Sequence, residues 1–156
     1  MTLIARLIAA AALAASSFAF AADPTPAPSP ANDRLAPARA EIQANRWVAA
    51  IDELKKVNDT GSADWNNLMG YSHRKAKTPD YAAAERYYDE ALRIDAKHRG
   101  ALEYSGELYL VKGDLAKAEE RLSRLDKACF LPCEEYADLK KAVARFKANG
   151  NRYVAE

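Results

Sequence analysis

The sequence predicts an all-α fold, an α-solenoid of paired helices, on three observations. From residue 33 onward no segment shows the sustained apolar/polar alternation that is typical of a strand. Ala, Leu, Glu, Lys and Arg dominate this part of the chain, and these residues favour helices. Small and large side chains also recur at a spacing of 34 residues. A fixed period of this size is typical of stacked helical hairpins, in which neighbouring units share a core.

The first 32 residues are expected to lie outside this fold. Residues 1–21 combine one early positive charge, Arg6, with an uncharged apolar run and a small-x-small motif that ends at Ala21. These features are typical of a cleaved signal peptide. The run is shorter than the roughly 20 residues that span a bilayer, and an uncleaved membrane anchor is the alternative. We expect cleavage near Ala21 or Ala22, a periplasmic location, and a Pro-rich disordered tether over residues 22–32.

Seven helices are expected after this segment, separated by polar residues and glycines. Ser62, Asp80 and Asp114 precede three of them, and their side chains can accept hydrogen bonds from the first backbone amides of a helix. Gly61 and Gly113 are expected to end helices in the left-handed conformation. The predicted ranges are 34–44, 47–57, 63–76, 81–95, 98–112, 115–127 and 133–148.

The 34-residue period is carried by three sets of equivalent positions. The first set holds only alanine, which lets two paired helices approach closely. The second set, one turn later, holds large side chains that fill the space between the helices. The three sets are Ala50, Ala84 and Ala118; Leu54, Tyr88 and Leu122; and Val57, Ala91 and Leu125. This pattern resembles the tetratricopeptide-repeat (TPR) family, whose unit is a helix–turn–helix of this length.

The resemblance to the TPR family covers about residues 33–126, and residues 81–92 match best. It implies about three TPR hairpins, a C-terminal capping helix and a frayed tail. Gly70 and Gly106 lie 36 residues apart, so the turn inside the second hairpin should be two residues longer than the turn inside the third. The first hairpin, with Ala38 in place of the glycine, matches less well. The expected boundaries are 33–60, 61–96 and 97–128 for the hairpins, 129–149 for the cap and 150–156 for the tail.

In the TPR family the concave face of the inner helices binds partners, and the resemblance implies this role for six residues here. They carry both charges, donors and acceptors, with Arg39 and Arg74 expected toward one end and Glu103 and Glu107 toward the other. Such a set suits an extended or helical peptide of mixed charge. An ordinary solvated helix face is the alternative. The six residues are Arg39, Asn67, Tyr71, Arg74, Glu103 and Glu107.

Cys129 and Cys133 are the only cysteines in the sequence. An even number of cysteines in an exported protein indicates a disulfide. Residues at this separation can bring their Cα atoms within disulfide range, so we predict that a disulfide pins the capping helix to the last hairpin. Two free thiols are one alternative. A thiol-redox protein that uses this pair is the other, and it would need a thiol of lowered pKa.

Composition and motifs argue against several other classes. Lys and Arg number 23 and Asp and Glu 22, so the chain lacks the basic excess that favours nucleic acid or an anionic membrane. His73 and His98 have no metal-ligand spacing, and the sequence contains no P-loop, nucleophile elbow or HExxH motif. Trp47 and Trp65 occupy helix-packing positions, which argues against a carbohydrate binder. We therefore expect a monomeric, non-enzymatic adaptor without metal or cofactor, whose partner is another exported or membrane protein.

Overall fold

The computed structural model describes residues 33–154, and every regular element within this range is a helix. The seven helices follow the predicted ranges to within two residues at each end. The predicted signal peptide and tether lie outside the described residues. The helices are α1 (Ala36–Gln43), α2 (Trp47–Val57), α3 (Ala63–Lys75), α4 (Tyr81–Ile94), α5 (Arg99–Val111), α6 (Leu115–Ala128) and α7 (Glu134–Ala148).

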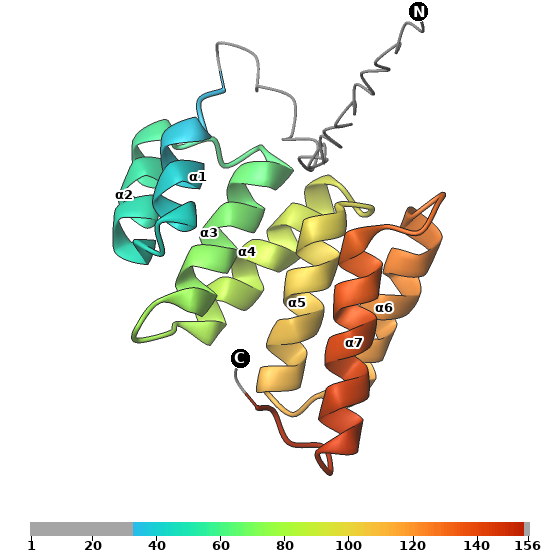
Figure 1. The fold of residues 1–156 in the computed structure, drawn as a ribbon. Helices are drawn as coiled ribbons and strands as arrows, with labels where there is room; N and C mark the ends of the chain where they lie inside the picture. The colour runs from blue at the N-terminus through green and yellow to red at the C-terminus, as the bar shows by residue number, and fades with distance from the viewer. Residues whose placement is uncertain (1–32, 155–156) are drawn as a thin grey trace, which may run out of the picture. The chain divides into compact units, whose positions relative to one another are not determined.

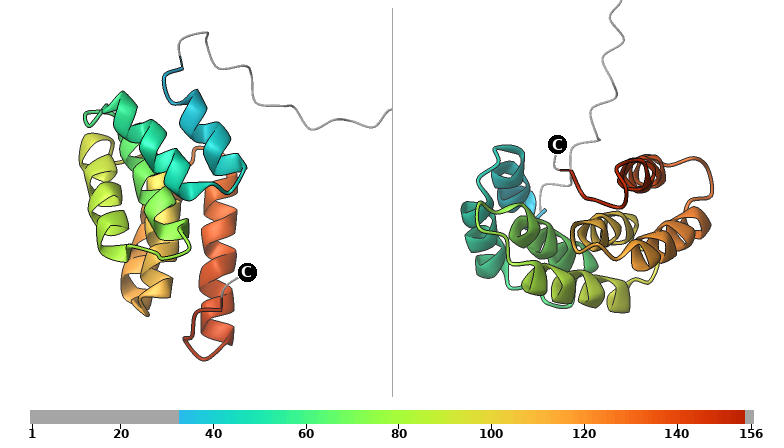
Figure 2. Two further views of the ribbon diagram at one scale, coloured as in Figure 1. Left: turned by 90° about the vertical axis from the view of Figure 1, so that its left-hand side faces the viewer. Right: turned by 90° about the horizontal axis from the view of Figure 1, so that it is seen from below.

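The helices pack as successive hairpins, which confirms the predicted all-α, solenoid-like arrangement (Figure 1). α1 packs on α2, α3 on α4 and α5 on α6, while α2 contacts α3 and α4 contacts α5. α7 follows the last hairpin and packs against both α5 and α6. Figure 2 shows α1, α3, α5 and α7 on one side of this stack and α2, α4 and α6 on the other. We call the first side the odd-helix face and the second the even-helix face.

The predicted N-caps are confirmed. Ser62 accepts a hydrogen bond from the backbone amide of Trp65 at 3.3 Å, and Asp80 accepts one from Ala83 at 2.8 Å. Asp114 caps α6 in the same way, at 3.0 Å. Each cap satisfies one of the amides that a helix start leaves without a partner. Helix starts are therefore set by local side chains, which is why the sequence predicts them well.

One of the two predicted left-handed helix ends is wrong. Gly113 adopts a left-handed conformation after α5, with φ of 77°. Gly61 does not, because α2 already ends at Val57 and the left-handed residue that follows it is Asn58, with φ of 50°. Asparagine is one of the few residues other than glycine that visits this conformation at low cost.

The alanines of the 34-residue repeat share one environment. Ala50, Ala84 and Ala118 are each 0% exposed. The large residues one turn later are not equivalent, because Leu54 and Tyr88 are fully buried whereas Leu122 is only partly buried. Within the described residues α6 is the last helix of the even-helix face, so no further hairpin covers its outer side.

Two glycines mark close helix contacts. A Cβ atom on Gly70 would lie 2.7 Å from the ring of Tyr88, and one on Gly106 would lie 2.6 Å from the side chain of Leu139. The turn between α3 and α4 is longer than the turn between α5 and α6 by the predicted two residues, since it covers 76–80 rather than 112–114.

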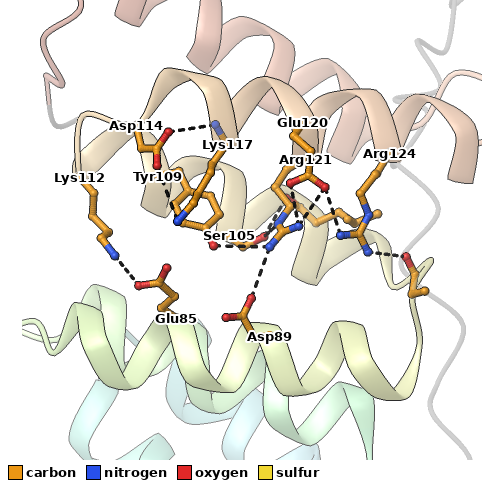
Figure 3. Close-up of polar contacts among 12 residues, drawn as sticks. Glu85, Asp89, Ser105, Tyr109, Lys112, Asp114, Lys117, Glu120, Arg121 and Arg124 are labelled. Atoms are coloured by element: carbon orange, nitrogen blue, oxygen red, sulfur yellow. Dashed lines mark hydrogen bonds and ion pairs between the residues drawn. The ribbon is translucent and has the colours of Figure 1, made fainter.

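On the even-helix face, Arg121 joins the second and third hairpins (Figure 3). Its guanidinium donates to the hydroxyl of Ser105 at 3.1 Å and lies 3.3 Å from the carboxylate of Asp89. Lys112 forms a second link to Glu85. Arg121 is 9% exposed, although the repeat assigned the core position to its neighbour Leu122. Arg121 and Lys112 thus link the third hairpin to α4 of the second hairpin.

α7 covers the apolar end of the last hairpin. Leu139, Val143 and Phe146 are buried against α5 and α6, and Tyr136 is partly buried beside them. Cys129 at the end of α6 and Cys133 at the start of α7 are joined by a disulfide, with their Cα atoms 6.0 Å apart. The structure thus places the cysteine pair at the predicted junction.

No helix within residues 33–154 combines the length and the apolar character needed to cross a membrane.

Replacing both cysteines by serine is expected to lower the free energy of unfolding by about 2 kcal/mol, since the disulfide closes a short loop in the unfolded chain. Urea unfolding of the Cys129→Ser/Cys133→Ser variant against the oxidised protein measures this loss. Wild-type protein kept in a reducing agent is the control and should match the variant. An unchanged midpoint would mean that the apolar contacts of α7 alone hold it in place.

Candidate partner-binding face

All six residues predicted to bind a partner belong to helices of the odd-helix face. α1 carries Arg39, α3 carries Asn67, Tyr71 and Arg74, and α5 carries Glu103 and Glu107. Because neighbouring odd helices pack side by side, residues separated by roughly one repeat come together. The structure joins some of these residues to each other and leaves others without partners.

Arg74 and Glu107 form an ion pair between α3 and α5, with 2.6 Å between the guanidinium nitrogen and the carboxylate oxygen. Arg74 is only 7% exposed. Burial alone would lower the pKa of Arg74, but the nearby Tyr88 and Glu107 outweigh burial and raise it above its usual value, so Arg74 stays charged. Two charges expected toward opposite ends of the face therefore neutralise each other where α3 meets α5.

Aromatic rings adjoin this ion pair. The ring centroids of Tyr71 and Tyr104 are 4.6 Å apart, and Trp47 lies edge-on to Tyr71 at 5.8 Å. The guanidinium carbon of Arg74 lies 5.5 Å and 5.7 Å from the two tyrosine centroids. Such distances permit cation–π attraction, so the rings help to hold Arg74 in place and present a partly exposed aromatic surface beside it.

Several polar atoms on this face have no partner within residues 33–154. The side-chain oxygen of Asn67 and the Nε of Arg74 are buried without a hydrogen bond. Glu103 is 8% exposed and makes neither a hydrogen bond nor an ion pair inside the described region. A buried polar group without a partner costs about 1–3 kcal/mol, and such groups in native proteins call for an explanation. Water or a bound ligand would satisfy them.

Glu103 is also the most perturbed carboxyl group of the face. Burial and, after it, the charges of Glu107, Asp138 and Glu135 together raise its pKa to about 8. The charge of Arg74 opposes this rise, but its effect on the pKa is the smallest of those of the groups named here. The Glu103 carboxyl therefore lies where negative charge is in excess.

At the N-terminal end of the face, Asp64 joins α1, α3 and the start of α5. Its carboxylate lies 3.5 Å from Arg39 and 2.9 Å from Nε2 of His98. A hydrogen bond from His98, followed by other charges, holds the pKa of Asp64 below its usual value. The other ring nitrogen of His98 accepts the backbone amide of Ala101 and caps α5. His98 is thus an interhelical contact, and Arg39 serves the same junction.

α7 contributes acidic residues to this face that sequence reasoning missed. The carboxylate of Glu135 lies 3.5 Å from the guanidinium of Arg99 of α5. The negative charge of Asp138 contributes to the raised pKa of Glu103. The sequence predicts this segment only as a capping helix. The missed signal is that Glu135 and Asp138 lie one turn apart, beside Leu139.

The end of the chain also approaches this face. Tyr153 and Val154 line a cavity of about 130 Å³ together with Arg74 and Glu107. Part of the predicted frayed tail therefore lies against the inner helices. Within the described range no group of three or more His, Cys, Asp or Glu side chains is placed to hold a metal ion.

A comparison with models of protein families finds no match to this chain, and no curated protein matches it either.

Proposed function

We propose that this chain is an exported TPR-type adaptor that binds a segment of another polypeptide on its odd-helix face. Two observations support this: the 34-residue repeat resembles the TPR family, and α3 and α5 bring polar and aromatic side chains together on one face. The mature protein would then act by holding its partner in the periplasm rather than by catalysing a reaction.

One observation carries the proposal: buried polar atoms without partners lie beside aromatic rings on a single face. The side-chain oxygen of Asn67 and the Nε of Arg74 are the polar atoms, and Tyr71 and Tyr104 contribute the rings. A polypeptide can satisfy both kinds of group, because its backbone supplies donors and acceptors and its side chains supply apolar surface. The even-helix face differs, since its principal buried cation, Arg121, is already surrounded by partners.

Photo-crosslinking in the native host tests the proposal. With p-benzoylphenylalanine in place of Tyr71 on the odd-helix face, the full chain is expected to crosslink to one polypeptide, with adducts confined to one segment of it. The matched control places the same group at Tyr81, which is 38% exposed on α4 of the even-helix face. This control should give no adduct or a much weaker one.

A third sample tests export. A chain without residues 1–21 should stay in the cytoplasm and lose the Tyr71 adduct, because the signal peptide and the partner's location are parts of the same proposal. Equal adducts from Tyr71 and Tyr81, or none from Tyr71 in the exported protein, would contradict binding on the odd-helix face. An adduct that persists without export would contradict the periplasmic location.

A further inference from the structure

The loop between α6 and α7 presents two large apolar side chains to solvent. Phe130 is 99% exposed and Leu131 is 71% exposed, the two highest values among the large apolar side chains of residues 33–154. Single exposed apolar residues are common on protein surfaces, but adjacent ones at the end of a loop form a continuous apolar surface. We call these two side chains the apolar tip.

The apolar tip is held in place by the covalent structure around it. The disulfide between Cys129 and Cys133 closes the loop, and Pro132 fixes its own φ and restricts the residue before it. A loop that is constrained before binding loses less conformational freedom when it binds. The tip is therefore suited to enter a cavity on another molecule.

Hollows on both sides of the loop leave the tip standing clear of the helices. A cavity of about 550 Å³ separates it from Arg99 of α5, and one of about 240 Å³ separates it from Tyr136 of α7. Glu134 lines the first cavity and Asp126 the second, and neither carboxylate forms an ion pair inside the described region. Lys127 follows Asp126 in the sequence but lines neither cavity. The tip is thus flanked by unpaired negative charge.

A small pocket at the start of α2 has the matching character. Trp47, Val48 and Ala49 give it an apolar wall, and its volume is about 250 Å³. Val48 is 69% exposed, so this wall is open to solvent. The volume is below that of sites that hold drug-sized molecules, which suits the cavity to a single side chain. We call this cavity the N-terminal pocket.

The charges at the N-terminal pocket are positive. Arg46 and Lys77 line it together with the apolar wall. Arg46 is paired with Glu41, whereas Lys77, in the turn between α3 and α4, forms no ion pair with any residue of the described range. A cation without a partner beside this pocket complements the unpaired carboxylates beside the apolar tip.

The tip of a chain cannot fill its own pocket. The N-terminal pocket belongs to the first helices of the stack and the tip to the last two, at the opposite end of it (Figure 1). Among the described helices, α2 contacts neither α6 nor α7. A second copy of the chain can bring the two surfaces together.

We propose that the apolar tip of one copy inserts into the N-terminal pocket of a second copy, so that the chain self-associates head to tail. Phe130 packs against Val48, and the carboxylates beside the tip approach Lys77. The two sides of this contact are different surfaces, so the contact is heterologous and can extend to further copies. The monomer expected from the sequence is then the state of the dilute protein.

This inference does not depend on the proposed function, because none of the six predicted partner-binding residues lines the tip or the pocket.

Sedimentation equilibrium of the purified chain tests the contact. The weight-average mass is expected to rise with concentration between about 10 μM and about 1 mM, as suits a small interface. Phe130→Asp removes the tip and Val48→Asp removes the pocket wall, and each should weaken association at least about tenfold. Val154→Asp is the matched control, since Val154 is 65% exposed elsewhere on the molecule, and it should associate like the wild type.

An equimolar mixture of the two variants identifies the surfaces. The Phe130→Asp chain keeps its pocket and the Val48→Asp chain keeps its tip, so one tip and one pocket can still meet. The mixture is expected to form a heterodimer and nothing larger, although each variant alone stays monomeric. This recovery also shows that both variants are folded.

Three results would overturn the proposal: a wild-type chain that stays monomeric at about 1 mM, either variant associating like the wild type, or a mixture no heavier than its components. Co-sedimentation of the wild type, but not of Phe130→Asp, with phosphatidylcholine vesicles would also overturn it, by assigning the tip to a membrane surface. None of these results changes the Tyr71 crosslink, which reports on the odd-helix face.

Discussion

Replacing Tyr88 by alanine is expected to lower the free energy of unfolding by about 3–5 kcal/mol. Tyr88 is 0% exposed and fills the space between α3 and α4, where its ring contacts the position of Gly70. Truncation removes a large buried side chain and leaves a cavity between two tightly packed helices. Urea unfolding followed by circular dichroism measures the change.

The matched control for this substitution is Leu122→Ala at the equivalent repeat position. Leu122 is only partly buried, so its truncation should cost about 1 kcal/mol, well below the range for a fully buried side chain. The sequence repeat alone would predict similar roles for the two residues. Similar losses in the two variants would show that the end of the solenoid is packed like its middle, which would contradict the structure.

Removing the negative charge of Glu107 is expected to cost about 3 kcal/mol, because it leaves the buried guanidinium of Arg74 without its partner. The Glu107→Met variant tests this, since methionine retains much of the packing volume. The pKa of Glu103 should fall in this variant, because a repelling carboxylate is lost and Arg74 is freed to interact with Glu103. Chemical unfolding and a ¹³C titration of Glu103 measure the two effects.

The Arg74→Met/Glu107→Met double variant completes the cycle. It is expected to be more stable than the sum of the single changes predicts, since a buried ion pair can be replaced by apolar side chains at little cost whereas one buried charge cannot stand alone. Additive losses would show that the two side chains do not interact. An unchanged Glu103 pKa in the Glu107→Met variant would contradict the electrostatic arrangement between α3, α5 and α7.

Local features of the chain account for the success of the helix predictions. Ser62, Asp80 and Asp114 act on the amides of the turn that follows them, so their effect needs no distant residue. The predicted left-handed helix end at Gly61 was wrong because α2 already ends before it, at the left-handed Asn58. Both residues can end a helix, and the choice between them depends on where the packing of α2 stops.

The candidate site was predictable in its position but not in its contacts. The repeat register and the TPR resemblance indicated the inner side of α3 and α5, and all six residues lie on helices of that side. That Arg74 meets Glu107 depends on how two hairpins stack across 33 residues of sequence. The acidic contribution of Asp138 depends on the rotation of α7 about its own axis. Neither quantity is encoded in a local pattern.

The sequence by itself determined the order of the helices, their pairing into hairpins, the alanines at the close contacts and the cysteines that join α6 to α7. These follow from short-range capping, from helix propensity and from a period that forces similar units to share a core. Only the tertiary structure decided that Arg121 rather than Leu122 is buried, and that Glu103 is buried without a counterion. One residue turns a helix by about 100°, so small differences in packing choose which side chain faces the interior.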